Sequence, residues 1–302
     1  MTAVNRTAAT SLPEPPVLVG IVAEIEADLK LRIEAVQGPE ALRQALAYSV
    51  LGGGKRLRPV LTLLSCEAVG GSRDQGREAA AAIELIHAFS LVHDDLPSMD
   101  DDALRRGQPT LHMHAGEAMA ILTGDVMMSL AFEWIADADL TPDTITQLVR
   151  TLADATSCMI AGQVYDTVGG FPAGLSRPLQ LELVHRNKTA ALIRAACRLG
   201  AHCSEGSPEA VEALTGYGEA VGLMFQVIDD LLDVTATAEH IGKATGKDLE
   251  AGKLTYPGVH GTEASRKEVV RLRDEALAAL APLGGAADHL RELCEYMAVR
   301  TR

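Results

Sequence analysis

The sequence has 302 residues, of which 47 % are hydrophobic and only 3 % aromatic, and its formal net charge at pH 7 is −14. A chain of this length can bury a sizeable core, and a composition rich in Ala and Leu favours helices over strands. The acidic balance argues against nucleic acid as a partner, because phosphate backbones attract basic surfaces. A small anionic substrate remains possible where basic residues are concentrated locally.

The cysteines and the apolar segments indicate where the protein resides. The five cysteines are scattered and form no CxxC pair, so we expect free thiols in a reducing, cytoplasmic compartment. No basic segment followed by an apolar core marks a signal peptide. The best candidate for a membrane span, residues 118–136, is interrupted by Asp125 and Glu133. We therefore expect no stable membrane insertion.

The order of the elements predicts one all-α domain. Residues 1–16 carry Pro13, Pro15 and Pro16 and are predicted to form a disordered tail before a domain of residues 17–302. No segment convincingly predicts a strand, and no linker divides the chain. Apolar residues at helical spacing predict helices near 19–33, 42–51, 60–68, 78–96, 115–137, 143–169, 177–199 and 208–234, with two closing helices within 263–302.

The first segment with chemical potential is GGGKRLRP, residues 52–59. Its glycines allow a sharp turn, and three cations, Lys55, Arg56 and Arg58, fall within four residues and can hold an anion. The segment lacks the leading glycine and the Ser or Thr after the lysine, so it is not a nucleotide-binding P-loop. From this segment alone, an ordinary basic helix start is the preferred interpretation.

The segment that organises the rest of the chain is an acidic cluster after the helix of residues 78–96. Five aspartates (Asp94, Asp95, Asp100, Asp101 and Asp102) fall within nine residues, and two arginines follow at once. Uncompensated carboxylates at the end of a buried helix are costly, which favours a hard cation such as Mg²⁺. A solvated acidic loop is the alternative, whereas a calcium loop would need oxygen ligands and a glycine in place of Leu96, Pro97 and Met99.

His87 precedes the acidic cluster by about two helical turns, on the same face as Asp94. It is either a core histidine or a residue of the same site. A second acidic motif, Asp229, Asp230 and Asp233, lies far down the chain on the helix of residues 208–234. Neighbouring carboxylates on one face repel unless a cation bridges them.

The two acidic helices predict a metal site in the interior of a helical bundle. Aspartates without histidine or cysteine partners select Mg²⁺ over Zn²⁺ or iron, and no Glu-x-x-His pair indicates a di-iron centre. The second motif is followed by a loop rich in glycine and lysine, with Lys243, Lys247 and Lys253, which is suited to close over a ligand.

Taken together, the motifs resemble those of the trans-prenyltransferases, the isoprenyl diphosphate synthase family. GGGKRLRP, HDDLPSMDDDALRRG, HRNKTAAL, FQVIDDLLD and GKATGKDLEAGKLTYP stand in the family's usual order between Gly52 and Pro257. The spacing of Asp95 and Asp100 resembles bacterial and plant members rather than the animal type. The resemblance implies a bundle of roughly ten or more helices around a central cavity.

The resemblance also implies a role for each matching residue. Three Mg²⁺ ions would be held by the two acidic motifs, with Asp94, Asp100 and Asp229 as direct ligands beside Asp95, Asp230 and Asp233. Isopentenyl diphosphate would be bound through Lys55, Arg58, His87 and Arg106, and the allylic diphosphate through Arg105, Lys188, Lys243 and Lys253. Thr189 and Gln226 would face the reacting carbons, where their oxygens could stabilise positive charge.

The reaction implied is head-to-tail condensation of isopentenyl diphosphate with dimethylallyl or geranyl diphosphate. In this family the product grows past the residues before the first acidic motif, here Phe89 and Ser90. Phe89 lies about 7.5 Å of helix from Asp94 and could act as a floor, which predicts farnesyl diphosphate. Geranylgeranyl diphosphate is the alternative product, and simple core packing is the alternative role of Phe89.

Other functions remain to be distinguished. A class I terpene cyclase would share the first acidic motif but would not need the cations for a second diphosphate. A non-catalytic regulatory subunit would have lost acidic residues, and this chain keeps both sets. The chain departs from many relatives at Ala103, Gln108 and Ala190, none of which is assigned to metal or diphosphate. The resemblance further implies a homodimer.

Overall fold

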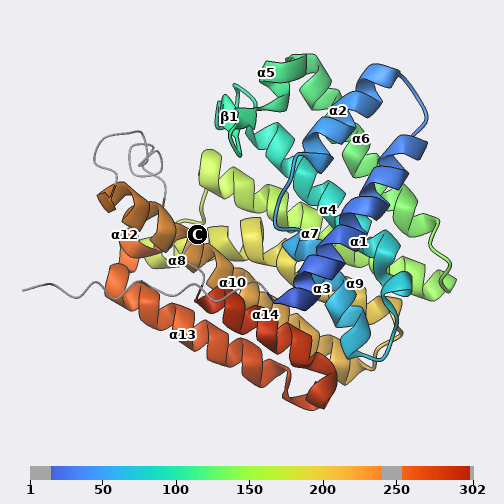
Figure 1. The fold of residues 1–302 in the computed structure, drawn as a ribbon. Helices are drawn as coiled ribbons and strands as arrows, with labels where there is room; N and C mark the ends of the chain where they lie inside the picture. The colour runs from blue at the N-terminus through green and yellow to red at the C-terminus, as the bar shows by residue number, and fades with distance from the viewer. Residues whose placement is uncertain (1–14, 240–253, 300–302) are drawn as a thin grey trace, which may run out of the picture.

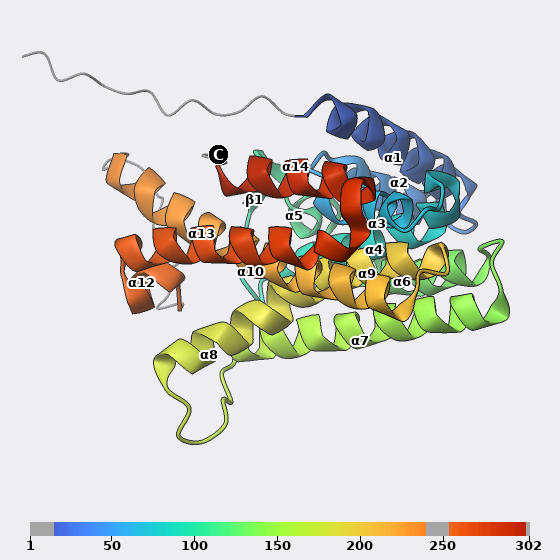
Figure 2. The same cartoon turned by 90° about the horizontal axis from the view of Figure 1, so that it is seen from below.

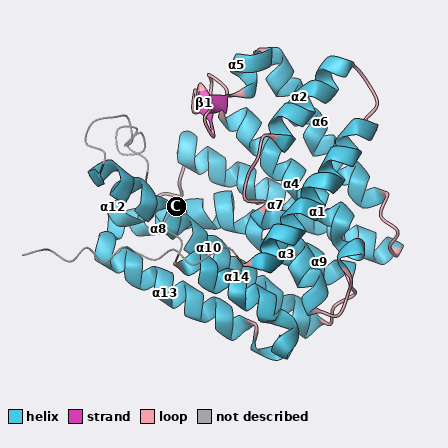
Figure 3. Cartoon of the chain, viewed as in Figure 1, coloured by secondary structure: helices cyan, strands magenta, loops and turns pink. Residues whose placement is uncertain are grey.

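The computed structural model describes residues 15–239 and 254–299, and these residues are almost entirely helical, as the sequence predicts (Figures 1 and 3). The first helix, α1 (Pro16–Ala35), begins earlier than its apolar pattern near Val19 suggests, because Pro16 is well suited to a first helical position. The rest of the predicted tail lies outside the described residues. Its boundary at residue 16 stays a prediction.

The helices occur largely where periodicity places them. After α1 come α2 (Glu40–Leu51), α3 (Leu57–Ala68), α4 (Arg73–Asp94), α5 (Leu111–Ala115), α6 (Glu117–Ala136), α7 (Pro142–Thr167), α8 (Arg177–Val184), η1 (His185–Ala190), α9 (Ala191–Cys203), α10 (Pro208–Glu239), α12 (Tyr256–His260), α13 (Thr262–Ala279), η2 (Ala281–Ala287) and α14 (Asp288–Ala298). Seen from below, α13 and α14 lie on one side of α9 and α10, and α7 lies on the other (Figure 2).

Two local features were not predicted from the sequence. A hairpin of two short antiparallel strands, β1 (Leu104–Arg105) and β2 (Gln108–Pro109), follows the acidic cluster. Its two turn residues, Arg106 and Gly107, both have positive φ, as short hairpin turns require. The helix expected over 177–199 is also not uniform, because its centre, η1, is a π-helix. Hydrophobic periodicity cannot reveal either feature.

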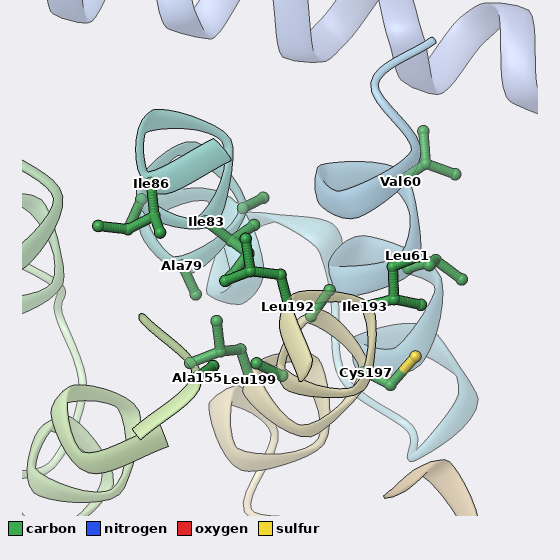
Figure 4. Packing of buried hydrophobic residues seen from close by; sticks show 14 of the residues in the cluster. Val60, Leu61, Ala79, Ile83, Ile86, Ala155, Leu192, Ile193, Cys197 and Leu199 are labelled. Carbon is green, nitrogen blue, oxygen red and sulfur yellow. The ribbon is translucent and has the colours of Figure 1, made fainter. Parts of the chain in front are cut away.

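The core is built around α4, whose residues 79–86 are all buried. A helix that is apolar on every side belongs in the middle of a protein, and its small alanines let neighbouring helices approach closely. Figure 4 shows Ala79, Ile83 and Ile86 of α4 beside Leu61 of α3 and Leu192 of α9. Asp94 ends α4, so the acidic cluster follows the end of a buried helix, as predicted.

One of the described helices, α6, is long and apolar enough to cross a membrane by length and composition. It packs chiefly against α4, and Met127, Leu130 and Trp134 are among its buried side chains. Its opposite face carries Ile121 and Leu122, which are 44 % and 57 % exposed. The apolar character of α6 is therefore explained in part by the core and in part by an uncovered surface.

Candidate active site

A cavity of about 600 Å³ lies between α4, α7 and η1. Predicted site residues from three separate segments line it, namely Arg58, His87, Phe89, Ser90, Asp94, Lys188 and Thr189. Most of the remaining wall is apolar and comes largely from Leu96, Met99, Ile121, Met159, Ile160, Val164, Val168 and Leu192. Such a cavity suits a ligand that combines a charged group with a hydrocarbon chain.

Asp94 brings a carboxyl group to this cavity from the last turn of α4. Burial raises its pKa to about 6, and the nearby carboxylate of Asp100 acts in the same direction. The ammonium of Lys188 opposes the rise. Lys188 itself donates from Nζ to Oδ2 of Asp166 at 2.6 Å. A carboxylate that is costly to ionise beside a cavity is suited to receive a cation.

Arg58 and His87 form the basic part of the same wall. Nε of Arg58 is buried and has no hydrogen-bond partner within the described part of the chain. Burial lowers the pKa of the Arg58 guanidinium, and the carboxylates of Glu84 and Asp229 oppose this. Burial and the neighbouring arginines hold the pKa of His87 well below its usual value. His87 is therefore neutral at pH 7 and can donate one hydrogen bond.

Gln163 of α7 is a site candidate that the sequence marks as polar without a role. Both of its amide atoms, Nε2 and Oε1, are buried without a hydrogen-bond partner in the described structure. Gln163 also lines the cavity. Because buried polar groups are almost always paired, an amide in this state is suited to a polar ligand in the cavity.

Asp95 and Arg105 form an ion pair with each other in this structure. Asp95 is only 3 % exposed, and Arg105 donates from Nε to both carboxylate oxygens at 2.9 Å and from Nη2 to Oδ1 at 2.6 Å. This two-pronged pair fixes the hairpin against the end of α4. The roles implied for the two residues, toward metal and toward the allylic diphosphate, stay predictions.

Next to the large cavity lies a smaller one of about 60 Å³, between α2, α4 and the hairpin. His87 lines both cavities, and Arg105 and Arg106 line the smaller one. Arg106 donates to the backbone carbonyl of Gly53, which joins the hairpin to the glycine-rich loop. Gly54, beside the Arg106 guanidinium, has a φ of 143°, which strains residues with a Cβ, so glycine is favoured there.

Arg56 does not belong with the anion-binding cations with which the sequence groups it. It is 3 % exposed, and its guanidinium donates to Glu26 of α1 at 2.6 Å, to Glu84 of α4 at 2.7 Å and to the carbonyl of Val50 at 2.6 Å. Its backbone is left-handed, with φ of 48°. All of its donors are directed inward, so Arg56 anchors the loop and leaves Lys55 exposed to solvent.

The second acidic motif reaches the site through α10. Thr189 donates from Oγ1 to Oε1 of Gln226 at 2.7 Å, and Nε2 of Gln226 donates to Oδ1 of Asp230 at 2.8 Å. The backbone N–H of Tyr256 donates to Oδ2 of Asp230 at 2.7 Å, and Nε2 of His185 lies 3.4 Å from the same oxygen. Burial raises the pKa of Asp230 to about 7, although these donors oppose it.

The two acidic motifs thus adjoin one region of the bundle. Asp94 lines the cavity directly, Asp229 acts electrostatically on Arg58 in the cavity wall, and Asp230 connects to the wall through Gln226. Lys243 and Lys253 lie outside the described residues, as does Lys247. Their predicted contribution is therefore not tested.

The donor set fits a hard divalent ion shared with a ligand. Among residues 15–239 and 254–299, no three His, Cys, Asp or Glu side chains form a group that could hold a metal ion on its own. Mg²⁺ commonly uses one or two carboxylates together with water and substrate phosphate oxygens, so it needs no complete protein cage. The carboxylates of Asp94, Asp100 and Asp229 are of the right type for such a shared site.

Comparison with known proteins agrees with this geometry. The sequence profile of the family "Polyprenyl synthetase" matches residues 39–281. Geranylgeranyl pyrophosphate synthase 11, chloroplastic, of Arabidopsis thaliana is 46 % identical over 277 residues, covering 88 % of this chain and 76 % of the relative. A geranylgeranyl pyrophosphate synthase of Capsicum annuum is 43 % identical, covering 84 % of this chain and 72 % of the relative.

Solved structures show the same fold. The crystal structure of a geranyltransferase from Legionella pneumophila superposes with a TM-score of 0.82 at 31 % identity, covering 93 % of this chain and 95 % of that one. The helical cavity, the order of the motifs and the extent of these matches lead to one conclusion. The chain belongs to the polyprenyl synthetase family and is a trans-prenyltransferase that elongates prenyl chains.

Proposed function

We propose that the protein is a Mg²⁺-dependent geranylgeranyl diphosphate synthase. It would add isopentenyl diphosphate successively to an allylic diphosphate and release inorganic diphosphate at each step. The observation that carries the proposal is the cavity of about 600 Å³, where Arg58, Asp94 and Lys188 adjoin a largely apolar wall. The charged side chains suit a diphosphate, and the apolar wall suits a growing hydrocarbon chain.

The comparisons favour geranylgeranyl over the farnesyl product that Phe89 predicts. The plant relatives described above are named as geranylgeranyl pyrophosphate synthases. Phe89 does line the cavity, and its ring meets the ring of His93 edge-on at 5.1 Å. Phe89 shares this wall with Ile121, Met159 and Ile160 of α6 and α7. The names of the relatives therefore carry the proposed product.

The reaction needs a diphosphate to leave an allylic carbon. Lys188 would bind this leaving group, and Asp94, Asp100 and Asp229 would hold the metal beside it. Mg²⁺, when bound, would neutralise the charge that develops on the departing oxygen. Thr189 and Gln226 would direct oxygen lone pairs toward the allylic cation. Arg58 and His87 would hold isopentenyl diphosphate so that its double bond attacks that carbon.

The final step is loss of a proton from the newly joined chain. The cavity wall holds no carboxylate or histidine other than Asp94, His87 and His93 among the described residues. Asp94 is assigned to metal, and His87 to the second diphosphate. We propose that the released diphosphate, an anion held beside the new bond, accepts the proton.

We further propose that the protein works as a homodimer. The exposed side of α6 carries two large apolar side chains, Ile121 and Leu122, and Ile121 also lines the cavity. Ile160 and Val164 of α7 are also exposed, as is Val168 directly after it, and all three line the same cavity. A second copy over this surface would remove these side chains from water.

The function is tested by incubating the purified protein with Mg²⁺, isopentenyl diphosphate and, separately, dimethylallyl, geranyl and farnesyl diphosphate, and sizing the products by chromatography. We expect a twenty-carbon diphosphate from each primer. Accumulation of the fifteen-carbon product, with farnesyl diphosphate left unused, would reject the proposed product. Absence of elongation would reject the reaction. Asp94→Ala should abolish turnover while the circular dichroism spectrum stays that of the wild type.

Phe89→Ala tests the cavity wall. Removing the ring lengthens the space beside α4, so we expect products longer than those of the wild type, resolved by reversed-phase chromatography. Phe132→Ala is the matched control, because Phe132 of α6 packs against the core and does not line the cavity. It should lower stability without changing product length. An unchanged distribution in Phe89→Ala would place the limit to growth elsewhere.

A further inference from the structure

Thr189 uses its hydroxyl proton differently from other helical threonines of this protein. Thr62, Thr156 and Thr215 each donate to the carbonyl four residues earlier, which is the usual local bond of a helical threonine. Thr189 lies in the π-helix η1 and donates across to Oε1 of Gln226 on α10 instead. A hydroxyl has one proton, so only lone pairs of Thr189 remain for the cavity.

The direction of this hydrogen bond depends on how the Gln226 amide is turned. Its Nε2 donates to Oδ1 of Asp230 at 2.8 Å, which leaves Oε1 to accept from Thr189. The other oxygen of Asp230 accepts from the backbone N–H of Tyr256 at 2.7 Å. Both oxygens of Asp230 act as acceptors in this arrangement, so Asp230 holds the NH₂ side of the Gln226 amide.

We infer that Asp230 is a positioning residue that sets the polarity of the cavity wall, through Gln226, so that Thr189 presents lone pairs and not a proton to the reacting carbons. The inference rests on the proposed function, in which positive charge develops there. It departs from the metal-holding role that the resemblance implies for Asp230, because the residue is only 6 % exposed and its carboxylate is oriented by Gln226 and the Tyr256 N–H.

Replacement of Asp230 by asparagine should reverse the relay. Oδ1 of the asparagine must accept from the Tyr256 N–H, so its NH₂ group faces Gln226. Two NH₂ groups cannot bond to each other, so the Gln226 amide turns and offers its oxygen to residue 230. Its NH₂ then donates to Thr189, whose proton is directed into the cavity. The substitution keeps the shape of the side chain at residue 230 and reverses only the direction in which the Thr189 hydroxyl dipole faces the cavity.

A second substitution restores the original direction. In D230N/Q226E, one oxygen of the glutamate accepts from the asparagine NH₂ and the other accepts from Thr189. Thr189 again presents lone pairs to the cavity, with the same formal charge in the network as the wild type. Q226E alone places two carboxylates 2.8 Å apart and serves as the control for introducing the glutamate.

The experiment compares wild type, D230N, Q226E and D230N/Q226E. Removing one oriented dipole from an active site typically lowers kcat by about 10²–10³-fold. We therefore expect kcat of D230N to fall by about 10²-fold or more. The KM for each substrate should change less than threefold. The double variant should recover at least tenfold of that loss. Calorimetric titration with Mg²⁺ and inorganic diphosphate should give Kd values within threefold for wild type and D230N, because Asp230 is not a metal ligand.

The other outcomes overturn the inference. Loss of Mg²⁺ and diphosphate binding in D230N would make Asp230 a metal-holding residue. Wild-type turnover in D230N would show that residue 230 does not set the polarity of the cavity wall. A double variant that is no more active than D230N would show the same. Thermal unfolding of the four proteins tests the hydrogen-bond network independently of turnover. Q226E should unfold at a lower temperature than wild type, and adding D230N to Q226E should restore the wild-type unfolding temperature. Inactive wild-type protein would reject the proposed function, whereas absence of this thermal coupling would reject the inference.

Discussion

Asp94 shows how a buried carboxyl group affects stability. It lies in the last turn of α4 beside the cavity, and burial raises its pKa to about 6 from 3.8. The folded protein therefore binds a proton at this site more tightly than the unfolded chain does. Stability contributed by Asp94 is present below pH 4 and is lost as the pH rises through 6.

Asp94→Asn should consequently stabilise the metal-free protein at neutral pH. We expect the thermal midpoint at pH 7 to rise by about 2 °C, since ~1 kcal/mol corresponds to a few degrees in a protein of this size. The gain should vanish near pH 4, where Asp94 is itself protonated. Differential scanning calorimetry at both pH values measures this, with Asp139→Asn at an exposed position as the control. A lower midpoint at pH 7 would contradict the prediction.

At the scale of residues, the sequence predicts which side chains lie together better than it predicts the role of each one. Arg58, His87, Asp94 and Lys188 line one cavity, as their motifs suggest. Arg56 was expected to contact an anion, but its donors are taken by Glu26, Glu84 and Val50. These partners lie up to 30 residues away and come together only through folding. No local pattern distinguishes a buried arginine from an exposed one in such a segment.

At the scale of elements, Arg56 is the junction of three segments. It joins the glycine-rich loop to α1 and α4 in a buried ion pair with Glu84. Arg56→Ala would leave Glu84 buried and unpaired, so we expect the free energy of unfolding to fall by about 3–5 kcal/mol. Urea denaturation measures this.

Arg271→Ala is the control for Arg56→Ala. Arg271 pairs with Glu268 and Glu275 on the surface of α13, so its loss should cost no more than about 1 kcal/mol. Equal losses in the two variants would show that Arg56 is not an anchor.

The π-helix η1 is held between two helices that approach it through glycines. A Cβ on Gly162 of α7 would lie 2.2 Å from the backbone nitrogen of Lys188. A Cβ on Gly222 of α10 would lie 2.6 Å from Cα of Ala190. The residues that present Lys188 and Thr189 to the cavity are therefore fixed by close backbone packing on both sides.

Gly222→Ala should displace η1. Overpacking of this kind typically costs about 1–3 kcal/mol, and we expect a matching fall in unfolding free energy together with reduced turnover. Gly216→Ala is the control on the same helix, since its Cβ would lie 3.6 Å from Cβ of Ala279, an ordinary contact. Alanine there should stabilise the helix by about 0.5–1 kcal/mol. If both variants were equally active and stable, close packing at η1 would not position the site.

Most elements can be predicted because the apolar pattern of this chain is regular. α4, α7 and α10 carry buried faces that extend over many turns, so their existence follows from periodicity. The hairpin of β1 and β2 is too short to have a pattern. The π-helical geometry of η1 leaves no trace in the apolar pattern either, and its contacts with α7 and α10 join residues far apart in the sequence.

At the scale of the whole molecule, the proposed dimer can be tested by changing the α6 surface. Leu122→Glu adds a charge to the centre of the apolar face, which should shift the sedimentation coefficient from that of a dimer to that of a monomer. Leu179→Glu is the control, because Leu179 of α8 is similarly exposed, at 50 %, and lies outside this face. Identical sedimentation of Leu122→Glu and wild type would place the dimer interface elsewhere, or show that there is none.

The continuous rod formed by α8, η1 and α9 has a consequence for how the length of the chain can vary. Each residue in a helix turns the next by about 100°, so inserting or deleting one residue within 177–203 would rotate Lys188 or Thr189 away from the cavity. The glycine contacts at η1 leave no room to absorb the shift. We expect homologous enzymes to keep the length of this rod and to confine insertions and deletions to connections such as residues 168–176.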